Sequence, residues 1–295
     1  MVAAMRRREL ACLAVTSLAL IGFSASARAA NDSAGRDPTE AYLDSLVAGD
    51  RAALRAGFSG EPTIDDPMGG RVRGDAAFAR FVAERHAWLR ARSARVVPVR
   101  TTRGATRTIV ESVLQLRDAK GTIELPIAVV GERAGTRVSA LRVYHSHWPL
   151  EGKHRVRPPL LRADPAARVT GVVADYQRAL AAGDVDAIVA TFEPDGYFRE
   201  PSGGVYIHKG RDKLRAFMKQ ILAAGGIGIE HATVTDDGIV TAIEFNAVRF
   251  GRQQLTPQAG LAIYERARSG RLAAARIYDD VNVEVLAAPK PKPPL

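Results

Sequence analysis

The chain has 295 residues, of which 46% are hydrophobic and 25% charged, as in most soluble globular proteins. Its formal net charge is +10, which is typical of nucleic-acid or anionic-lipid binding and also of a solvated basic face. Only 6% of residues are aromatic and none is interleaved with the clustered arginines, so we favour the solvated face and expect no nucleic-acid partner. The single cysteine, Cys12, lies in the N-terminal 30 residues, which excludes a disulfide, a thiolate nucleophile or a zinc–cysteine site from the remainder.

Residues 1–30 are predicted to be a cleaved signal peptide. Three arginines, at 6–8, precede an apolar run over 10–25, and Ala27 and Ala29 supply the small residues that a signal peptidase requires. The arginines are compatible with twin-arginine export as well as with Sec export. We therefore expect a periplasmic or secreted protein that has no membrane association once the signal is removed.

The rest of the chain contains an internal repeat with an offset of 134 residues. Between 41–70 and 175–204, 11 of 30 positions are identical without a gap. The shared residues are Tyr42, Leu46, Ala48, Gly49, Asp50, Ala53, Ala56, Phe58, Pro67, Gly69 and Gly70, with Tyr176, Leu180, Ala182, Gly183, Asp184, Ala187, Ala190, Phe192, Pro201, Gly203 and Gly204. The offset returns at Arg137, Arg142 and Tyr144, which match Arg271, Arg276 and Tyr278. This period is too long for a solenoid and fits two whole domains.

Each copy has the same predicted order of elements. A helix begins at Asp37-Pro38 or Asp164-Pro165 and ends near Gly49 or Gly183, where a second helix begins with Asp50 or Asp184 as its N-cap. A short extended stretch precedes Pro67 or Pro201. A third helix is predicted at 75–91 and at 211–223, from apolar residues spaced by three and four. Strands follow at 94–102, 105–117, 121–132 and 136–147, and at 228–235, 238–250, 254–266 and 271–285.

This order predicts an α+β fold with two tandem cone-shaped domains, each a curved antiparallel sheet packed on three helices. The expected domains are residues 38–148 and 164–286. A proline-rich, basic linker occupies 149–163, and a Pro/Lys tail occupies 287–295. A cone formed by a bent sheet and helices favours a ligand pocket.

The run at 42–50, the Ile-Asp-Asp-Pro-Met-Gly-Gly segment at 64–70 and Gly74 before a helix resemble the ketosteroid isomerases. These belong to the nuclear-transport-factor-2-like, or SnoaL-like, superfamily, whose members include isomerases, cyclases, dehydratases and non-catalytic proteins. The resemblance implies that Tyr42 is an oxyanion-hole donor and Asp66 a general base, with Tyr176 and Glu200 as their counterparts. It implies a reaction without a cofactor. It also implies that the family's second oxyanion-hole acid corresponds to the positions of Ala128 and, in the second copy, near Ala262. Both copies lack this acid.

A base and a donor are what the isomerisation of an unsaturated ketone requires: the base removes an α-proton and the donor stabilises the enolate oxygen. Ketosteroid isomerase performs this chemistry with a carboxylate base and hydrogen-bond donors. Each residue also has a structural alternative. Tyr42 and Tyr176 are compatible with ordinary core positions, and Asp66 with a turn that binds its own backbone. Glu200 is compatible with a surface charge.

The last strand of each copy supplies candidate pocket-lining residues. In the first copy Leu141, Val143 and His145 alternate toward one face, and in the second Ile277 and Asp279 do so. His145 and Asp279 are candidate substitutes for the missing acid. His145 and His147 are spaced as two metal ligands on a strand, but no third ligand is evident, so we expect no metal.

Two functions remain open. The first is an exported, cofactor-independent enzyme of ketosteroid-isomerase type that acts by proton transfer on a small apolar carbonyl compound, such as a steroid or polyketide. The second is a non-catalytic exported protein that holds an apolar ligand in its pocket. Because isomerases of this type form homodimers, the resemblance also implies that the two copies pack as an intramolecular pseudo-dimer.

Overall fold

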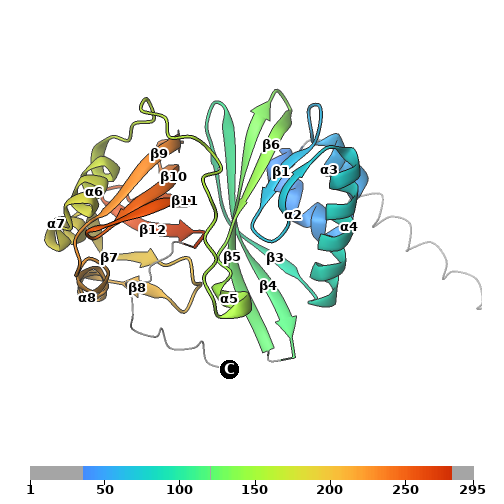
Figure 1. Cartoon of the computed structure of the whole chain (residues 1–295). Coiled ribbons are helices and arrows are strands. Elements are labelled where there is room, and N and C mark those ends of the chain that lie inside the picture. Colours follow the sequence, from blue (N-terminus) through green and yellow to red (C-terminus); the bar gives the residue numbers. More distant parts are fainter. Residues whose placement is uncertain (1–35, 120, 281–295) are drawn as a thin grey trace, which may run out of the picture. The chain divides into compact units, whose positions relative to one another are not determined.

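A computed structural model describes residues 36–119 and 121–280 of the chain (Figure 1). The predicted signal peptide and the Pro/Lys tail lie outside the described residues. None of the helices in the described part has the length and hydrophobicity needed to cross a membrane. Two six-stranded sheets, each with its own helices, make up the described chain, which confirms the α+β class and the tandem arrangement.

The helices of the first domain begin and end where the sequence predicts. They are α2 (Pro38–Ala48), α3 (Arg51–Ala56) and α4 (Asp75–Ala91). The Asp37 carboxylate accepts a hydrogen bond from the Thr39 amide, and Asp50 caps α3 in the same way. Gly49 ends α2 with a φ of 72°, a left-handed conformation that favours glycine. Figure 1 shows these helices together beside the first sheet.

The first sheet is mixed rather than purely antiparallel. Its strands are β1 (Thr63–Asp66), β2 (Gly70–Arg73), β3 (Arg95–Arg103), β4 (Arg107–Asp118), β5 (Gly121–Ala134) and β6 (Arg137–Tyr144). Their order is β2-β1-β6-β5-β4-β3. The four long strands are antiparallel, as expected, but β1 lies parallel to β6, with Ile64 opposite Leu141. This pairing carries the segment before Pro67 into the sheet, next to the strand that bears the predicted pocket residues.

The second domain repeats this plan with one difference at its start. Its helices are α6 (Gly171–Ala182), α7 (Val185–Thr191) and α8 (Arg211–Ile221). The prediction of a helix from Asp164-Pro165 is wrong, because Asp164 caps only a single turn and α6 begins after it. Gly171 follows with a φ of 58°, which prevents a helix from continuing through this point.

The second sheet has the same topology as the first. Its strands are β7 (Phe192–Arg199), β8 (Ile207–Lys209), β9 (Ile227–Asp236), β10 (Val240–Phe250), β11 (Gln253–Arg266) and β12 (Leu272–Tyr278). Their order is β8-β7-β12-β11-β10-β9, with β7 parallel to β12. The hairpin turns at Gly238 and Gly270 have φ values of 90° and 86°. Strand β12 ends at Tyr278, earlier than predicted, and 281–285 lie outside the described residues.

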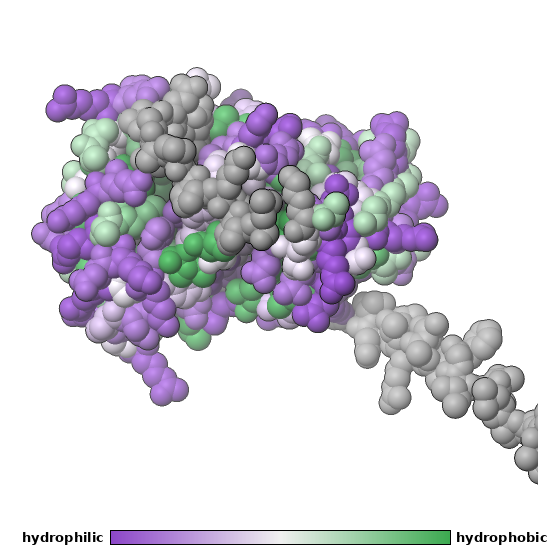
Figure 2. Space-filling model, turned by 90° about the horizontal axis from the view of Figure 1, so that it is seen from below, coloured by the Kyte–Doolittle hydropathy of each residue, from purple (hydrophilic) through white to green (hydrophobic). Residues whose placement is uncertain are grey.

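Buried apolar side chains form one core within each domain and a third cluster shared by both sheets. The shared cluster contains Ile109, Ala128, Val130, Tyr144, Val240, Ala242, Leu261, Ile263 and Tyr278. One face of the molecule, shown in Figure 2, is mainly hydrophilic, with small and separate hydrophobic patches.

The linker contains a short helix, α5 (Trp148–Glu151), and is tied to the end of the second sheet by Asp280. The Asp280 carboxylate is fully buried. It accepts hydrogen bonds from the Ser146 hydroxyl at 2.5 Å and from the backbone amides of His147 and Arg155 at 2.9 and 2.8 Å. The His154 ring lies 2.8 Å from the same carboxylate. Asp280, two residues after β12, therefore holds the linker in place.

Candidate functional site

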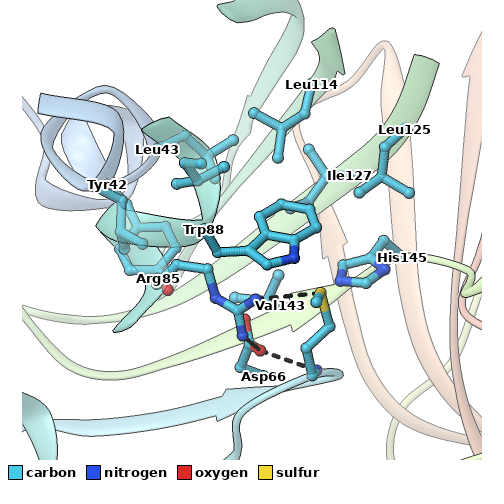
Figure 3. Close-up of a pocket in the computed structure, with 13 residues that line it drawn as sticks. Tyr42, Leu43, Asp66, Arg85, Trp88, Leu114, Leu125, Ile127, Val143 and His145 are labelled. Atoms are coloured by element: carbon cyan, nitrogen blue, oxygen red, sulfur yellow. Dashed lines mark hydrogen bonds and ion pairs between the residues drawn. The ribbon is translucent and has the colours of Figure 1, made fainter. Parts of the chain in front are cut away.

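A small cavity of about 30 Å³ lies between the helices and the sheet of the first domain (Figure 3). Its walls are mostly apolar side chains from α2, α4, β4, β5 and β6. The polar groups among them are Tyr42, Asp66, Arg85 and His145. The space holds about one water molecule, so a larger ligand would have to displace side chains at its edge.

Asp66 ends β1 and is oriented by three donors on one oxygen. Its Oδ1 accepts hydrogen bonds from the backbone amides of Met68 at 2.9 Å and Gly69 at 2.6 Å, and from Arg85 Nη2 at 2.7 Å. The close approach of Gly69 depends on its lack of a side chain, since a Cβ there would lie 2.7 Å from the Phe81 ring. Among the described residues nothing bonds Oδ2, so this oxygen is the one free to accept a proton.

Arg85, from the middle of α4, is a site residue that sequence reasoning missed. Its side chain is 13% exposed and forms the ion pair with Asp66, and Nη1 lies 3.2 Å from the Met68 sulfur. Its guanidinium also lies 5.5 Å from the centre of the Phe81 ring. The corresponding position in α8 is Ile221, counted from Gly74 and Gly210 before the two helices. A comparison of the two third helices would have shown this arginine as a feature of one copy only.

Tyr42 supplies the hydrogen-bond donor of the cavity. It lies on the inner face of α2, is 2% exposed, and its hydroxyl makes no hydrogen bond within the described chain. Burial raises the pKa of Tyr42 well above its usual value, the nearby Asp66 charge raises it further, and Arg85 opposes this. The phenol therefore stays protonated at neutral pH and is available to a bound acceptor.

His145 lines the same cavity, together with Val143, directly after β6. Burial lowers the pKa of His145 to about 4, although the Asp66 charge opposes this. Its Nδ1 lies 3.1 Å from the backbone carbonyl oxygen of Ser146, which can only accept, so Nδ1 carries the proton. The remaining nitrogen, Nε2, is then an acceptor. His145 is therefore not a substitute for the missing acid, because it is neutral and its proton is already engaged.

The predicted position of the second oxyanion acid requires a correction. Ala128 faces the cluster shared by the two sheets, whereas its neighbour Ile127 lines the cavity. Ala128 lies opposite Glu111 in the sheet, and the equivalent pair in the second domain is Leu261 with Glu244. The repeat offset is thus 133 in these strands, and Ala262 is not the counterpart of Ala128. The cavity still lacks a second acid, since an isoleucine occupies the facing position.

In the second domain the predicted pair is not brought together in the same way. Tyr176 packs against Phe192 and Tyr264, and burial alone raises its pKa, with no contribution from Glu200. Glu200 is buried and lies 2.9 Å from Nε2 of His208. Of the remaining predicted pocket residues, Leu141 belongs to the core of the first domain and Ile277 packs against that of the second.

Asp279 serves the linker instead of standing free in a second pocket. Its buried carboxylate forms an ion pair with Arg157 at 2.7 Å, and Arg157 also donates to the backbone carbonyl of Val143 at 2.8 Å. Burial raises the pKa of Asp279 to about 7, against the opposing effect of Arg157. Asp279 has a φ of 75°, a backbone conformation that residues other than glycine rarely adopt. The structure thus assigns this residue to the junction between linker and sheets.

No group of three or more histidine, cysteine or acidic side chains is arranged to hold a metal ion in the described ranges. His145 and His147 have ring centres 5.5 Å apart. His147 instead contacts Glu151, at 3.4 Å, and the backbone oxygen of Pro67, at 3.3 Å. The polar groups that line the cavity are of the kinds that accept a proton, as the Asp66 carboxylate does, and donate a hydrogen bond, as the Tyr42 hydroxyl does.

Comparison with known families agrees with this fold. Residues 173–275 match the family model of the SnoaL-like domain. This match confirms the predicted resemblance for the second domain, and the first has the same order of helices and strands. Comparison with curated proteins gave no match.

Several solved structures resemble parts of the chain. An NTF2-like protein of unknown function from Cytophaga hutchinsonii is 13% identical. The match covers 39% of this chain and 94% of that protein, with a TM-score of 0.30. A putative polyketide cyclase from Sinorhizobium meliloti is 21% identical; the match covers 37% of this chain and 94% of the cyclase, with a TM-score of 0.30. A hypothetical protein with a ketosteroid isomerase-like fold from Catenulispora acidiphila, in complex with trimethylamine, is 17% identical. The match covers 37% of this chain and 85% of that protein, with a TM-score of 0.32.

Proposed function

Starting from a SnoaL-like match over residues 173–275 and a second copy of the same topology before it, we propose that the first domain is the functional one. It binds a small apolar carbonyl compound, of steroid or polyketide type, and transfers a proton on it without a cofactor. The observation that carries this proposal is the pairing of Tyr42 and Asp66 in one buried cavity. Both residues line this cavity. The Asp66 charge also helps to raise the pKa of Tyr42, whereas burial alone raises that of Tyr176.

The two residues divide the reaction between them. Oδ2 of Asp66 accepts the proton from the carbon next to the carbonyl group, while Oδ1 stays bound to its three donors and fixes the plane of the carboxylate. The Tyr42 hydroxyl donates a hydrogen bond to the oxygen on which negative charge develops. Asp66 then returns the proton to the far carbon of the conjugated system, so that the double bond moves and no atom is gained or lost. Ile127 supplies no second donor, which favours a substrate whose enolate forms readily.

The second candidate is binding without turnover. Two observations favour it: the ion pair between Asp66 and Arg85, which stabilises the ionised carboxylate, and the small size of the cavity. In this case Tyr42 holds a ketone or phenol oxygen and Asp66 has a structural role in the turn at Met68.

We propose that the protein is exported and acts outside the cytoplasm. The support is the arginine cluster, apolar run and small residues of 1–30.

The second domain acts as an intramolecular partner, as the second subunit does in a homodimer. The support for this pseudo-dimer is the cluster of apolar side chains that both sheets share.

The test is an isomerisation assay with two β,γ-unsaturated ketones, a ketosteroid and a smaller cyclic ketone, followed by the absorbance of the conjugated product. The wild type is compared with Asp66→Asn, which keeps an oxygen acceptor for the turn but removes the base. Asp65→Asn is the matched control, because this neighbouring carboxylate does not line the cavity. The proposal predicts activity in the wild type and in Asp65→Asn, and its loss in Asp66→Asn. A wild-type rate no higher than that of Asp66→Asn for both ketones would exclude the isomerase. Saturable binding of either ketone without turnover would then support the second candidate.

A further inference from the structure

A second, larger hollow of about 290 Å³ adjoins the cavity of the first domain, and the two share part of their walls. We call this hollow the outer groove; it is formed by the turn after β1, by β2 and by the outer face of α4. Met68, Arg85 and Trp88 line both spaces. These three side chains therefore form the partition between the outer groove and the inner cavity.

The outer groove is positively charged. Arg71, Arg80 and Arg85 line it, and Glu84 is the one acidic residue among its lining residues. Among the described residues, Arg71 has only a long contact with a carboxylate, 3.9 Å to Asp65, and its side chain is 70% exposed. Three guanidinium groups around one hollow attract a carboxylate, which they can bind through paired hydrogen bonds.

Arg85 connects the groove to the proposed base. Its Nη2 donates to Asp66 in the inner cavity, and its Nε is buried without a hydrogen-bond partner among the described residues. The free form thus leaves one donor of this guanidinium unsatisfied, which is costly in a buried position. A carboxylate placed in the outer groove can satisfy this donor and compete with Asp66 for the guanidinium.

From this arrangement we propose that the ligand of the first domain carries a carboxylate as well as an apolar carbonyl body. The carboxylate binds in the outer groove to Arg80 and Arg85, and the apolar part passes between Met68 and Trp88 into the inner cavity. Binding draws Arg85 away from Asp66. The same event opens the partition, so that the inner space joins the larger groove, and releases the base from its ion pair.

This inference rests on the proposed function for its carbonyl site, but it names the substrate class and has a test of its own. The probes are naphthalene-2-acetate and naphthalene-2-acetamide, which differ in charge and hardly in shape. Their affinities are measured by titration calorimetry at low and at high salt. For the wild type we expect the carboxylate to bind at least about tenfold more tightly than the amide at low salt, with a smaller difference at high salt.

Five variants locate the effect. Arg80→Gln and Arg85→Gln reduce the preference for the carboxylate, and Arg85→Lys retains part of it. Arg90→Gln is the matched control, because Arg90 is an exposed arginine on the same helix that lines neither space; it leaves the preference unchanged. Asp66→Asn binds the carboxylate several-fold more tightly than the wild type, since Arg85 is no longer shared with an anion.

Equal affinity of the wild type for acid and amide would overturn the inference, as would a preference that persists in both Arg80→Gln and Arg85→Gln. A carboxylate affinity that does not rise in Asp66→Asn would overturn the release of Arg85. These readouts require no turnover. An absent isomerase activity with an intact carboxylate preference would therefore reject the proposed reaction and leave the anion site standing.

Discussion

Arg142 of β6 and Glu244 of β10 form a buried ion pair between the two domains, and Arg276 and Glu111 form the same pair in the opposite direction. Arg142 donates through Nη2 to Glu244 at 2.8 Å, and Arg276 donates through Nη2 to Glu111 at 2.8 Å. The tyrosine two residues after each arginine donates to the same carboxylate, at 2.7 Å from Tyr144 and 2.8 Å from Tyr278. The repeated Arg and Tyr residues near the end of each copy thus join the two sheets.

Removing one carboxylate from this arrangement leaves a buried guanidinium without its main partner. A buried pair adds little stability relative to apolar residues, but breaking one typically costs about 3–5 kcal/mol. We expect Glu244→Gln to lower the free energy of unfolding by about 3 kcal/mol, because Glu132 still contacts Arg142 at 2.7 Å. Urea denaturation measures the difference. The control is Glu61→Gln, which breaks the exposed pair with Arg73 and should cost less than about 1 kcal/mol. Similar losses in the two variants would contradict the prediction.

Tyr42→Phe tests the donor with little disturbance of packing, since the ring remains. In the assay for the proposed reaction, loss of one oxyanion donor should lower kcat on the order of 10²–10³-fold. Tyr176→Phe should leave kcat unchanged, because Tyr176 packs in an aromatic cluster away from the influence of Glu200. Steady-state kinetics of both variants decide the point. A comparable loss in Tyr176→Phe would show that the two domains act alike.

His145 should make stability depend on pH. Burial holds its pKa at about 4 in the folded protein, below the usual value of 6.5, so the unfolded chain binds more protons between these values. Its contribution is complete above pH 6.5 and is lost as the pH falls toward 4, by up to about 3 kcal/mol. Urea denaturation at several pH values should show a shallower decrease over this range in His145→Gln than in the wild type. Parallel curves for the two proteins would indicate that His145 is charged when folded.

Export can be tested at the N-terminus. The small residues at Ala27 and Ala29 predict cleavage near residue 30. Intact-mass measurement of the protein recovered from the periplasm or medium of an expressing bacterium should show a chain that begins there. Replacing Ala29 with a bulky residue should make the full-length precursor accumulate. Recovery of the uncleaved wild-type chain in the cytoplasm would contradict the prediction.

Arg85 bears on ligand selection as well as on the proposed reaction. If the arginine serves only to neutralise Asp66, an anionic group on the ligand brings no advantage. If a ligand carboxylate displaces it, the same residue both selects the ligand and frees the base. The position of Arg85 between two hollows is what makes the second arrangement possible.

The sequence by itself determined the repeat, the helix ends and the long strands. Caps such as Asp50 and left-handed glycines such as Gly49 act within a few residues, so they can be recognised without the fold. The residues before Pro67 and Pro201 were identified from the repeat and the family resemblance. The failed helix start at Asp164 shows the limit of the same reasoning, because a cap motif is satisfied by one turn as well as by a helix.

Only the tertiary structure decided which of these residues share a site. Asp66 meets Arg85 across 19 positions of sequence, and the parallel pairing of β1 with β6 is what brings Asp66 close to His145. The family resemblance placed the second acid at Ala128, and strand alternation could not test this, since its period specifies two faces of a sheet but not which one faces the helices. The second sheet covers the side that bears Ala128, and that contact depends on residues from both halves of the chain.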